Sequence, residues 1–294
     1  METVCNLCPR RCGVLRSDSE AAGVCRSPLL PRIARAAAHY GEEPCIAGKN
    51  GTGAVFFTGC NLRCVFCQNR GISRGEGGRP VSVPELRDIL LRLRDSGVDS
   101  IDLVTGTHYT PAIAEALSGL SLGIPVVWNS SGYESAESLR MLDGLVQIYM
   151  PDFKYWDSAA AKRYSAAADY PAVAAEAIKE MYRQVGPYEL DEYTLMKRGV
   201  LIRHLILPER REDAMNIIDF AADCFPEDSV LFSLMSQYTP MPGLDRFPEL
   251  MERVSAEDNQ SLIHYMKVRR LSGFWQDNAS ATEEMIPDFD LTGV

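Results

Sequence analysis

Short apolar runs alternate with segments of helical periodicity from residue 54 onward. An unbroken apolar run bounded by turn residues is typical of a buried strand. Strands are therefore predicted at residues 54–57, 101–104, 125–128, 146–150, 200–207 and, as the last strand, 230–235. Apolar residues three or four positions apart predict helices between them, at residues 84–96, 111–117, 134–142, 172–184 and 213–224.

Strand and helix alternate about six times, which indicates βαβ units and a parallel sheet. Right-handed crossovers would curl such a sheet into a barrel. We therefore expect an α/β fold, namely a partial (βα)6 TIM-like barrel with a Cys-rich N-terminal extension. Residues 1–50 would form that loop-rich, metal-binding extension, residues 51–240 the barrel, and residues 241–294 a C-terminal helical segment and acidic tail. From Asp277 the tail would be either disordered or a strap across the barrel.

Polar residues follow three of the predicted strands at the point where each strand ends. These stretches are residues 105–108 (TGTH), 129–131 (NSS) and 152–154 (DFK). Any one of them could simply terminate its strand. Three on the same edge favour a functional site, because active sites of α/β barrels gather at the carboxyl ends of the strands.

Charge and hydropathy narrow the class of protein. The net charge of −10 is carried mainly by residues 101–294. An acidic body repels a phosphate backbone, so a nucleic-acid partner is not expected. The chain shows neither a signal-peptide pattern nor an apolar run of about 18 residues, so we expect no membrane partner and a cytoplasmic location.

Eight of the nine cysteines lie within the first 67 residues. Thiols stay reduced in the cytoplasm, and closely spaced cysteines there favour metal binding over disulfides. The ninth, Cys224, falls on a predicted helix and is expected to be a small core residue.

Cys60, Cys64 and Cys67 form a C-x3-C-x2-C run directly after the first predicted strand. Three thiolates at this spacing can hold three irons of a cubane cluster, which leaves the fourth iron open to an exogenous ligand. The alternative is a zinc site, which would need a fourth ligand such as His39 or Cys45.

A second group, Cys5, Cys8, Cys12 and Cys25, supplies four thiols, enough for a closed zinc site or for an auxiliary cluster. We call it the quartet. Its spacing does not decide between the two metals, and Cys45 is an alternative fourth ligand.

The run at Cys60 resembles the signature of the radical S-adenosylmethionine (SAM) superfamily, C-x3-C-x-aromatic-C, with Phe66 in the aromatic position. The resemblance extends over most of the chain. Within the superfamily, the chain is similar to the branch related to pyruvate formate-lyase activating enzymes. The blocks that carry it are GCNLRCVFCQN, LVTGTHYTP, WNSSGYE, MPDFKYWD, IRHLILP and MSQY. The head of the chain, with Pro9 and arginines between the cysteines, also resembles that branch.

The resemblance implies a reaction. The amino and carboxylate groups of SAM would chelate the open iron of a [4Fe–4S] cluster, and one electron would cleave SAM to methionine and a 5′-deoxyadenosyl radical. That radical would abstract hydrogen from a substrate, either a protein glycine in a glycyl-radical enzyme partner or a small molecule. A flavodoxin or ferredoxin would supply the electron.

The resemblance also implies cofactor contacts. Residues 105–108, Thr105, Gly106, Thr107 and His108, stand where many relatives carry Gly-Gly-Glu. They lack a carboxylate, so the SAM ammonium would need hydroxyls, carbonyl groups or a neutral histidine as acceptors.

Further along the chain, Lys154 in the Asp152-Phe153-Lys154 run resembles the lysine of an Asp-Leu-Lys run and would neutralise the SAM carboxylate. Asn129 and Ser130 would bond to ribose or carboxylate oxygens. Phe66 would pack near the adenine, and His204 would be either a cofactor residue or a packed core residue.

An iron–sulfur electron carrier without radical chemistry is the alternative function. A carrier needs neither a barrel nor an open iron, which favours the enzyme. A nucleic-acid-binding protein with the quartet as a zinc module lacks the basic and aromatic clusters expected of one. SAM turnover by reduced protein separates these hypotheses.

Overall fold

The computed structural model describes residues 2–276 and 287–294. Within these ranges one sheet holds ten strands, of which nine follow the order β12-β11-β10-β8-β7-β6-β4-β3-β5 while β9 pairs with β10. The mutually parallel strands are β4 (Thr52–Phe57), β6 (Ser100–Val104), β7 (Val126–Ser130), β8 (Ile148–Pro151), β10 (Met196–Leu205), β11 (Leu231–Met235) and β12 (Gly273–Trp275). The antiparallel ones are β3 (Arg32–His39), β5 (Arg79–Pro80) and β9 (Glu189–Leu190).

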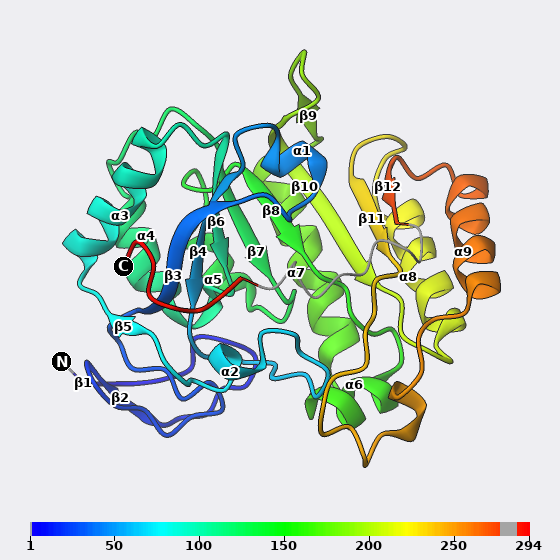
Figure 1. Cartoon of the computed structure of the whole chain (residues 1–294), viewed down its shortest axis with the longest axis horizontal. Helices are drawn as coiled ribbons and strands as arrows, with labels where there is room; N and C mark the ends of the chain where they lie inside the picture. The colour runs from blue at the N-terminus through cyan, green and yellow to red at the C-terminus, as the bar shows by residue number, and fades with distance from the viewer. Residues whose placement is uncertain (1, 277–286) are drawn as a thin grey trace.

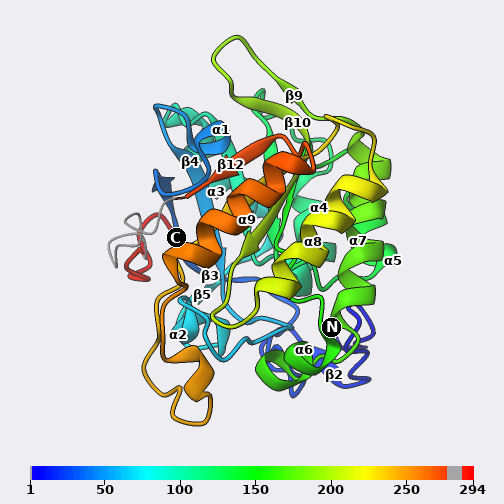
Figure 2. The ribbon, with the colours of Figure 1, turned by 90° about the vertical axis from the view of Figure 1, so that its right-hand side faces the viewer.

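Helices connect the parallel strands and flank the sheet (Figures 1 and 2). They are α3 (Val83–Asp95), α4 (Thr110–Leu117), α5 (Ala136–Arg140), α6 (Ser158–Ser165), α7 (Tyr170–Val185), α8 (Arg211–Cys224) and α9 (Ala256–Val268). Each strand from β4 to β11 in the parallel set is thus followed by a helix before the next parallel strand. The expected α/β partial barrel is confirmed.

Local sequence explains why α3 forms where it does. The Ser82 side chain accepts a hydrogen bond from the Glu85 backbone N–H, and the Glu85 carboxylate accepts one from the Ser82 backbone N–H. This capping box satisfies two donors that the first turn would leave unpaired. Leu86 and Leu90, one turn apart, are buried against the sheet.

The barrel interior is closed at one end by apolar side chains. The short helix α1 (Pro44–Ala47) buries Cys45 and Ile46 against inward-facing residues of the central strands, among them Val127, Ile148 and Leu201. Cys45 is therefore a core residue that belongs to neither of the two other cysteine groups. Side chains alternate along a strand, so Asn129 and Arg203, two positions after Val127 and Leu201, face the same interior nearer the carboxyl ends of the strands.

Two strands of three or more residues in the main sheet lie outside the sequence prediction. Residues 32–39, expected to be loop-rich, form β3, which pairs antiparallel with β4. The strand at 230–235 is not the last, because β12 pairs parallel with β11 beyond it. Cys224, expected in the core, is exposed at the end of α8.

The N-terminal segment carries a separate two-stranded sheet, β1 (Glu2–Val4) with β2 (Leu15–Ser17) (Figure 1). A further short helix, α2 (Arg70–Ser73), follows β4 in the sequence. At the other end of the chain, most of the predicted acidic tail, residues 277–286, lies outside the described residues. Residues 287–294 run along β3, where the Leu291 N–H donates to the Ala34 carbonyl at 3.0 Å and Arg35 pairs with Asp290 at 3.0 Å.

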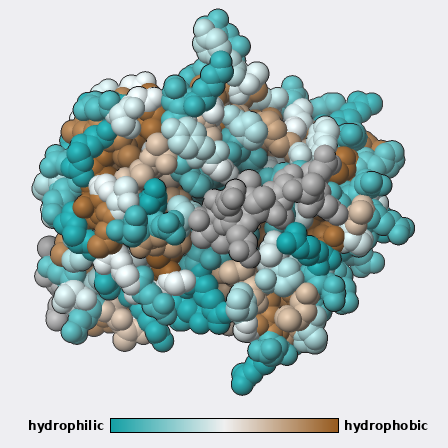
Figure 3. Space-filling view, viewed as in Figure 1, coloured by the Kyte–Doolittle hydropathy of each residue, from teal (hydrophilic) through white to brown (hydrophobic). Residues whose placement is uncertain are grey.

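The molecular face in Figure 3 is mixed, with hydrophilic side chains around separate hydrophobic patches. Among the described residues, no helix has the length and apolar character needed to cross a bilayer.

Candidate functional site

A cavity of about 250 Å³ opens at the carboxyl ends of the parallel strands. Its wall brings together most of the site residues that the sequence predicted. They are Cys60, Cys64, Phe66, Cys67, Thr105, Asn129, Ser130, Asp152 and Lys154. Segments nearly 100 residues apart in the sequence therefore meet around one space. This placement is the one expected for the active site of an α/β barrel.

The three cysteines of the C-x3-C-x2-C run lie on the loop after β4. Burial, together with the neighbouring thiols of Cys64 and Cys67, raises the pKa of Cys60 to about 12. Burial likewise raises the pKa of Cys67, and again Cys64 adds to the rise. Three neighbouring thiols, of which Cys60 is buried and Cys64 and Cys67 are half-buried, become thiolates together only beside positive charge. A bound iron cluster would provide that charge.

The loop also carries hydrogen bonds to the sulfur atoms. Cys60 Sγ accepts from the Leu62 and Arg63 backbone N–H groups at 3.4 and 3.5 Å, and Cys64 Sγ accepts from Ser165 Oγ at 3.1 Å. Such bonds stabilise thiolate ligands. Among residues 2–276 and 287–294, no group of three or more His, Cys, Asp or Glu side chains is arranged to hold a single metal ion. Three cysteines with hydrogen bonds to their sulfur atoms are the donor set that an iron–sulfur cluster uses.

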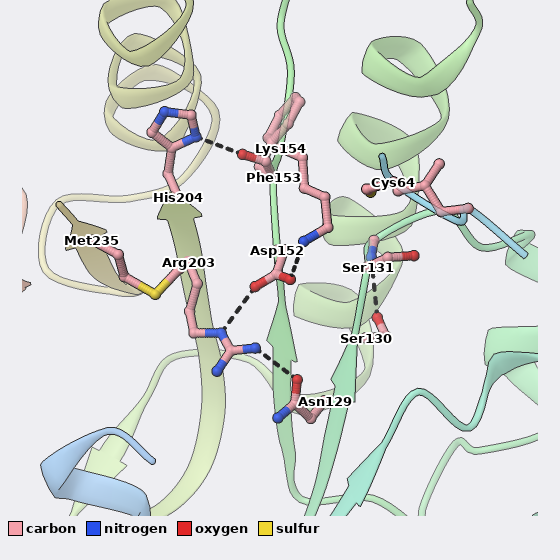
Figure 4. Close-up of polar contacts among 12 residues, drawn as sticks. Cys64, Asn129, Ser130, Ser131, Asp152, Phe153, Lys154, Arg203, His204 and Met235 are labelled. Carbon is pink, nitrogen blue, oxygen red and sulfur yellow. Dashed lines mark hydrogen bonds and ion pairs between the residues drawn. The ribbon is translucent and has the colours of Figure 1, made fainter. Parts of the chain in front are cut away.

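A charged cluster faces the cysteines across the cavity (Figure 4). Lys154 Nζ pairs with Asp152 Oδ2 at 2.6 Å, and Arg203 Nε pairs with Asp152 Oδ1 at 3.0 Å. The same guanidinium donates to Asn129 Oδ1 at 2.7 Å and pairs with Glu42 Oε2 at 2.9 Å. The Lys154 side chain is only 19% exposed, so it is not an ordinary surface lysine.

Opposing charges determine the ionisation of this cluster. Burial by itself would raise the pKa of Asp152, but the charges of Lys154 and Arg203 outweigh it and hold the pKa below its ordinary value. Burial by itself would lower the pKa of Lys154, but the charges of Asp152 and Cys64 outweigh it and raise the pKa. Asp152 and Lys154 are therefore an ionised pair.

A second carboxyl group lies deeper in the barrel. Asp102 on β6 is fully buried, and its Oδ2 accepts from Asn129 Nδ2 at 3.1 Å. Burial, with the negative charge of Glu42 as the next cause, raises the pKa of Asp102 well above its ordinary value. The surroundings of Asp102 therefore favour its neutral form.

Adjacent residues of β10 take opposite roles. Arg203 lines the cavity, whereas His204 does not. His204 donates from Nδ1 to the Phe153 carbonyl at 2.7 Å, and burial lowers the pKa of His204 to about 4. Sequence reasoning singled out the histidine and missed the arginine. Arg203 could have been found from the sequence, because it is a cation in a mostly apolar strand and lies on the opposite face from His204.

The TGTH stretch contributes only Thr105 to the cavity wall. Thr107 Oγ1 donates to Glu134 Oε1 at 2.6 Å, behind the cavity, and Trp128 Nε1 donates to the same oxygen at 2.9 Å. His108 donates from Nε2 to the Thr58 carbonyl at 2.7 Å, and burial lowers the pKa of His108 to about 3. Gly106 packs so closely on Trp128 that a Cβ there would lie 2.8 Å from the indole ring.

The buried carboxylate of Glu134 was missed because it lies on a different segment from the stretch that it supports. Glu134 accepts hydrogen bonds from the Thr107 and Trp128 side chains and does not line the cavity. Gly106, Thr107 and His108 are thus outside the cavity wall, although the resemblance implied cofactor contacts for them. His204, for which a packed core position was the alternative, also lies outside the wall.

The four cysteines of the quartet line a second, much smaller cavity of about 10 Å³. It lies beside the β1–β2 sheet. Arg10 links this region to the loop that carries Cys60, because its Nε donates to the Asn61 carbonyl at 2.8 Å.

Comparison with known proteins gives three results. The family described as the radical SAM superfamily matches residues 54–221, more than half of the chain. An uncharacterized protein of Methanocaldococcus jannaschii, MJ0674, is 29% identical over 269 residues, which cover 88% of this chain and 73% of that protein.

Among solved structures, Streptococcus suis SuiB has a TM-score of 0.50 at 14% identity and supports the fold alone. The match covers 77% of this chain and 48% of SuiB, so this chain spans about half the length of that protein. A domain of a pyruvate-formate lyase-activating enzyme from Bacteroides vulgatus has a TM-score of 0.38 at 14% identity, covering 66% of this chain and 91% of that domain.

Proposed function

The chain belongs to the radical SAM superfamily, and from that premise we propose that Cys60, Cys64 and Cys67 hold a [4Fe–4S] cluster whose open iron binds SAM. One observation carries the proposal: the three cysteines and the Asp152–Lys154–Arg203 cluster line the same cavity at the strand ends. A cysteine site and a cationic site on one cavity suit a ligand that has a carboxylate. An electron carrier would have no use for the cationic site.

When bound, the cluster and SAM supply a 5′-deoxyadenosyl radical through one-electron cleavage of SAM, and this radical abstracts hydrogen from a substrate. The protein's own groups bind and orient. Within the part of the chain that the structure describes, the Lys154 ammonium bonds only to Asp152, so its other donors can receive the carboxylate of SAM. The Thr105 and Ser130 hydroxyls and the Asn129 amide are the neutral polar groups of the wall.

The Phe66 ring supplies an apolar surface beside the cysteines. It packs edge-on against Tyr155 and Tyr238, with ring centroids 6.2 and 6.0 Å away, so its position is fixed by its neighbours. A fixed aromatic wall is suited to the adenine and keeps water from the reacting atoms.

The substrate and the source of the electron are further parts of this proposal. The electron comes from a flavodoxin or ferredoxin in the cytoplasm. The resemblance to activating enzymes makes a protein glycine in a glycyl-radical enzyme the first candidate substrate, with a small molecule as the second.

The direct test is cluster binding with SAM recognition. Protein reconstituted without oxygen should lose about four irons per chain when Cys60, Cys64 and Cys67 are all changed to alanine. The spectrum of the reduced cluster should shift on addition of SAM in the parent protein and not in this triple variant. Cys224→Ala, at the exposed end of α8, is the matched control and should behave like the parent. Unchanged iron content in the triple variant would overturn the site assignment.

A further inference from the structure

The quartet is too open for a single ion. Its four cysteines line one cavity of about 10 Å³, which is room for about one water molecule. Four thiolates around one zinc ion sit about 2.3 Å from it and leave no such room. The described residues also include no group of three His, Cys, Asp or Glu side chains arranged for one ion. The four thiols are therefore set wider apart than a single zinc ion requires.

Unpaired polar groups surround this same cavity. Arg16, Asn61 and His108 line it, and each has a buried side-chain atom (Nε, Oδ1 and Nδ1 respectively) with no hydrogen-bond partner among the described residues. Buried polar atoms in native proteins nearly always have partners, so three orphans around one cavity indicate a binding site.

The charge of the wall suits an anionic occupant. The Arg16 side chain is 4% exposed, and its Nη1 lies 3.8 Å from Cys5 Sγ. Arg10 and Arg11 also line the cavity. A cluster held by four thiolates carries negative charge, and buried guanidinium groups that donate to its sulfur atoms would stabilise it.

The quartet directly abuts the loop that carries Cys60. The Cys25 carbonyl packs on Gly59 so tightly that a Cβ there would lie 2.8 Å from its oxygen. On the other side of Cys60, the Asn61 amide lies beside the Cys8 thiol. The two residues that flank Cys60 thus each touch a cysteine of the quartet.

We propose that Cys5, Cys8, Cys12 and Cys25 hold a second [4Fe–4S] cluster, with one thiolate for each iron and no open position. It lies next to the cluster of the proposed function, close enough for the two to interact magnetically and exchange an electron. The existence of the second cluster stands on the quartet alone. Only its interaction with the first rests on the proposed function.

The test of the second cluster uses the full chain with Cys60, Cys64 and Cys67 changed to alanine. After reconstitution with iron and sulfide, this triple variant should keep about four irons and four sulfides per chain. Offered zinc and iron together, it should not take up zinc in their place. One zinc per chain, or no metal at all, would overturn the proposal. The result is independent of SAM cleavage, so failure here and failure of the proposed function are distinguishable.

The test of proximity uses the parent protein. Electron paramagnetic resonance of the fully reduced protein should show two interacting centres. The triple variant should show one simple spectrum. A Cys12→Ala/Cys25→Ala variant, which keeps Cys60, Cys64 and Cys67, should also show one simple spectrum. A parent spectrum equal to the sum of the two variant spectra would contradict the adjacency.

Discussion

At the scale of single residues, the charges around Asp152 explain how an anion can be received in a buried cavity. Arg203 is occupied on three sides, by Asp152, Asn129 and Glu42. Among residues 2–276 and 287–294, the Lys154 ammonium has one partner, Asp152, although it carries three donors. The lysine is therefore the cation with capacity left for a ligand, and the arginine holds the carboxylate that positions it.

Replacing Lys154 should weaken SAM binding without loss of the cluster. Lys154→Ala removes a charge-assisted bond in a partly desolvated site, which costs about 1.5–3 kcal/mol, or roughly ten- to a hundredfold in affinity. Lys154→Arg should restore only part of it, because a forked guanidinium does not replace a compact ammonium. The measurement is a titration of the reduced cluster's spectrum with SAM. Lys162→Ala, an exposed lysine on α6, is the control, and a Lys154→Ala curve equal to it would contradict the assignment.

The predicted residues that the structure brings to the cavity wall share one property: each lies in a short motif at or just after the end of a strand. Cys60 and Lys154 are examples, since strand ends and spacing are visible in one segment. Arg203, Glu42 and Glu134 were missed because their roles arise from pairing between segments as far as 161 residues apart. No local pattern shows that Arg203 will meet Glu42.

At the scale of secondary-structure elements, long amphipathic helices and apolar strands were predictable, whereas β3 and β12 were not. β12 is three residues long, too short to show periodicity, and β3 (RIARAAAH) is rich in alanine, which is a poor strand former. Both strands form because an existing sheet edge offers unpaired backbone groups.

Gly273 shows what the docking of β12 requires. Its φ is +146°, and a Cβ there would lie 1.9 Å from the Phe232 carbonyl oxygen of β11. Gly273→Ala should therefore force β12 away from β11 and lower the unfolding temperature by several degrees, since loss of about 1 kcal/mol shifts a chain of this size by roughly 2–4 °C. Gly71→Ala, where the added Cβ meets only Glu76 Oε2 at 3.9 Å, is the control. Equal unfolding temperatures for the two variants would refute this account of β12.

At the scale of the whole molecule, the barrel keeps His204 neutral in its core, and this makes stability depend on pH. Its pKa in the folded protein, about 4, lies below the ordinary value of 6.5 because of burial. The contribution of neutral His204 to the free energy of unfolding is therefore fully present above about pH 6.5. It is lost as the pH falls towards 4, at up to about 1.4 kcal/mol per pH unit.

His204→Asn should reduce this dependence, because the asparagine amide can take over the bond to the Phe153 carbonyl without a titrating ring. It should not abolish the dependence, because burial also lowers the pKa of His108, to about 3. The measurement is the unfolding temperature of each protein between about pH 7 and about pH 5.5. His264→Gln, an exposed histidine on α9, should retain the parent's dependence. A His204→Asn variant that loses as much stability on acidification as the parent would contradict the buried neutral form.

The central claim, that this barrel cleaves SAM at the cluster of Cys60, Cys64 and Cys67, is tested most directly by the product. Anaerobic, reconstituted and reduced protein is incubated with SAM, and 5′-deoxyadenosine is quantified beside the Cys60→Ala/Cys64→Ala/Cys67→Ala variant. The account predicts that 5′-deoxyadenosine and methionine accumulate with the parent and stay at background with the variant. No 5′-deoxyadenosine from a parent protein with its full iron content, or equal amounts from both proteins, would contradict it.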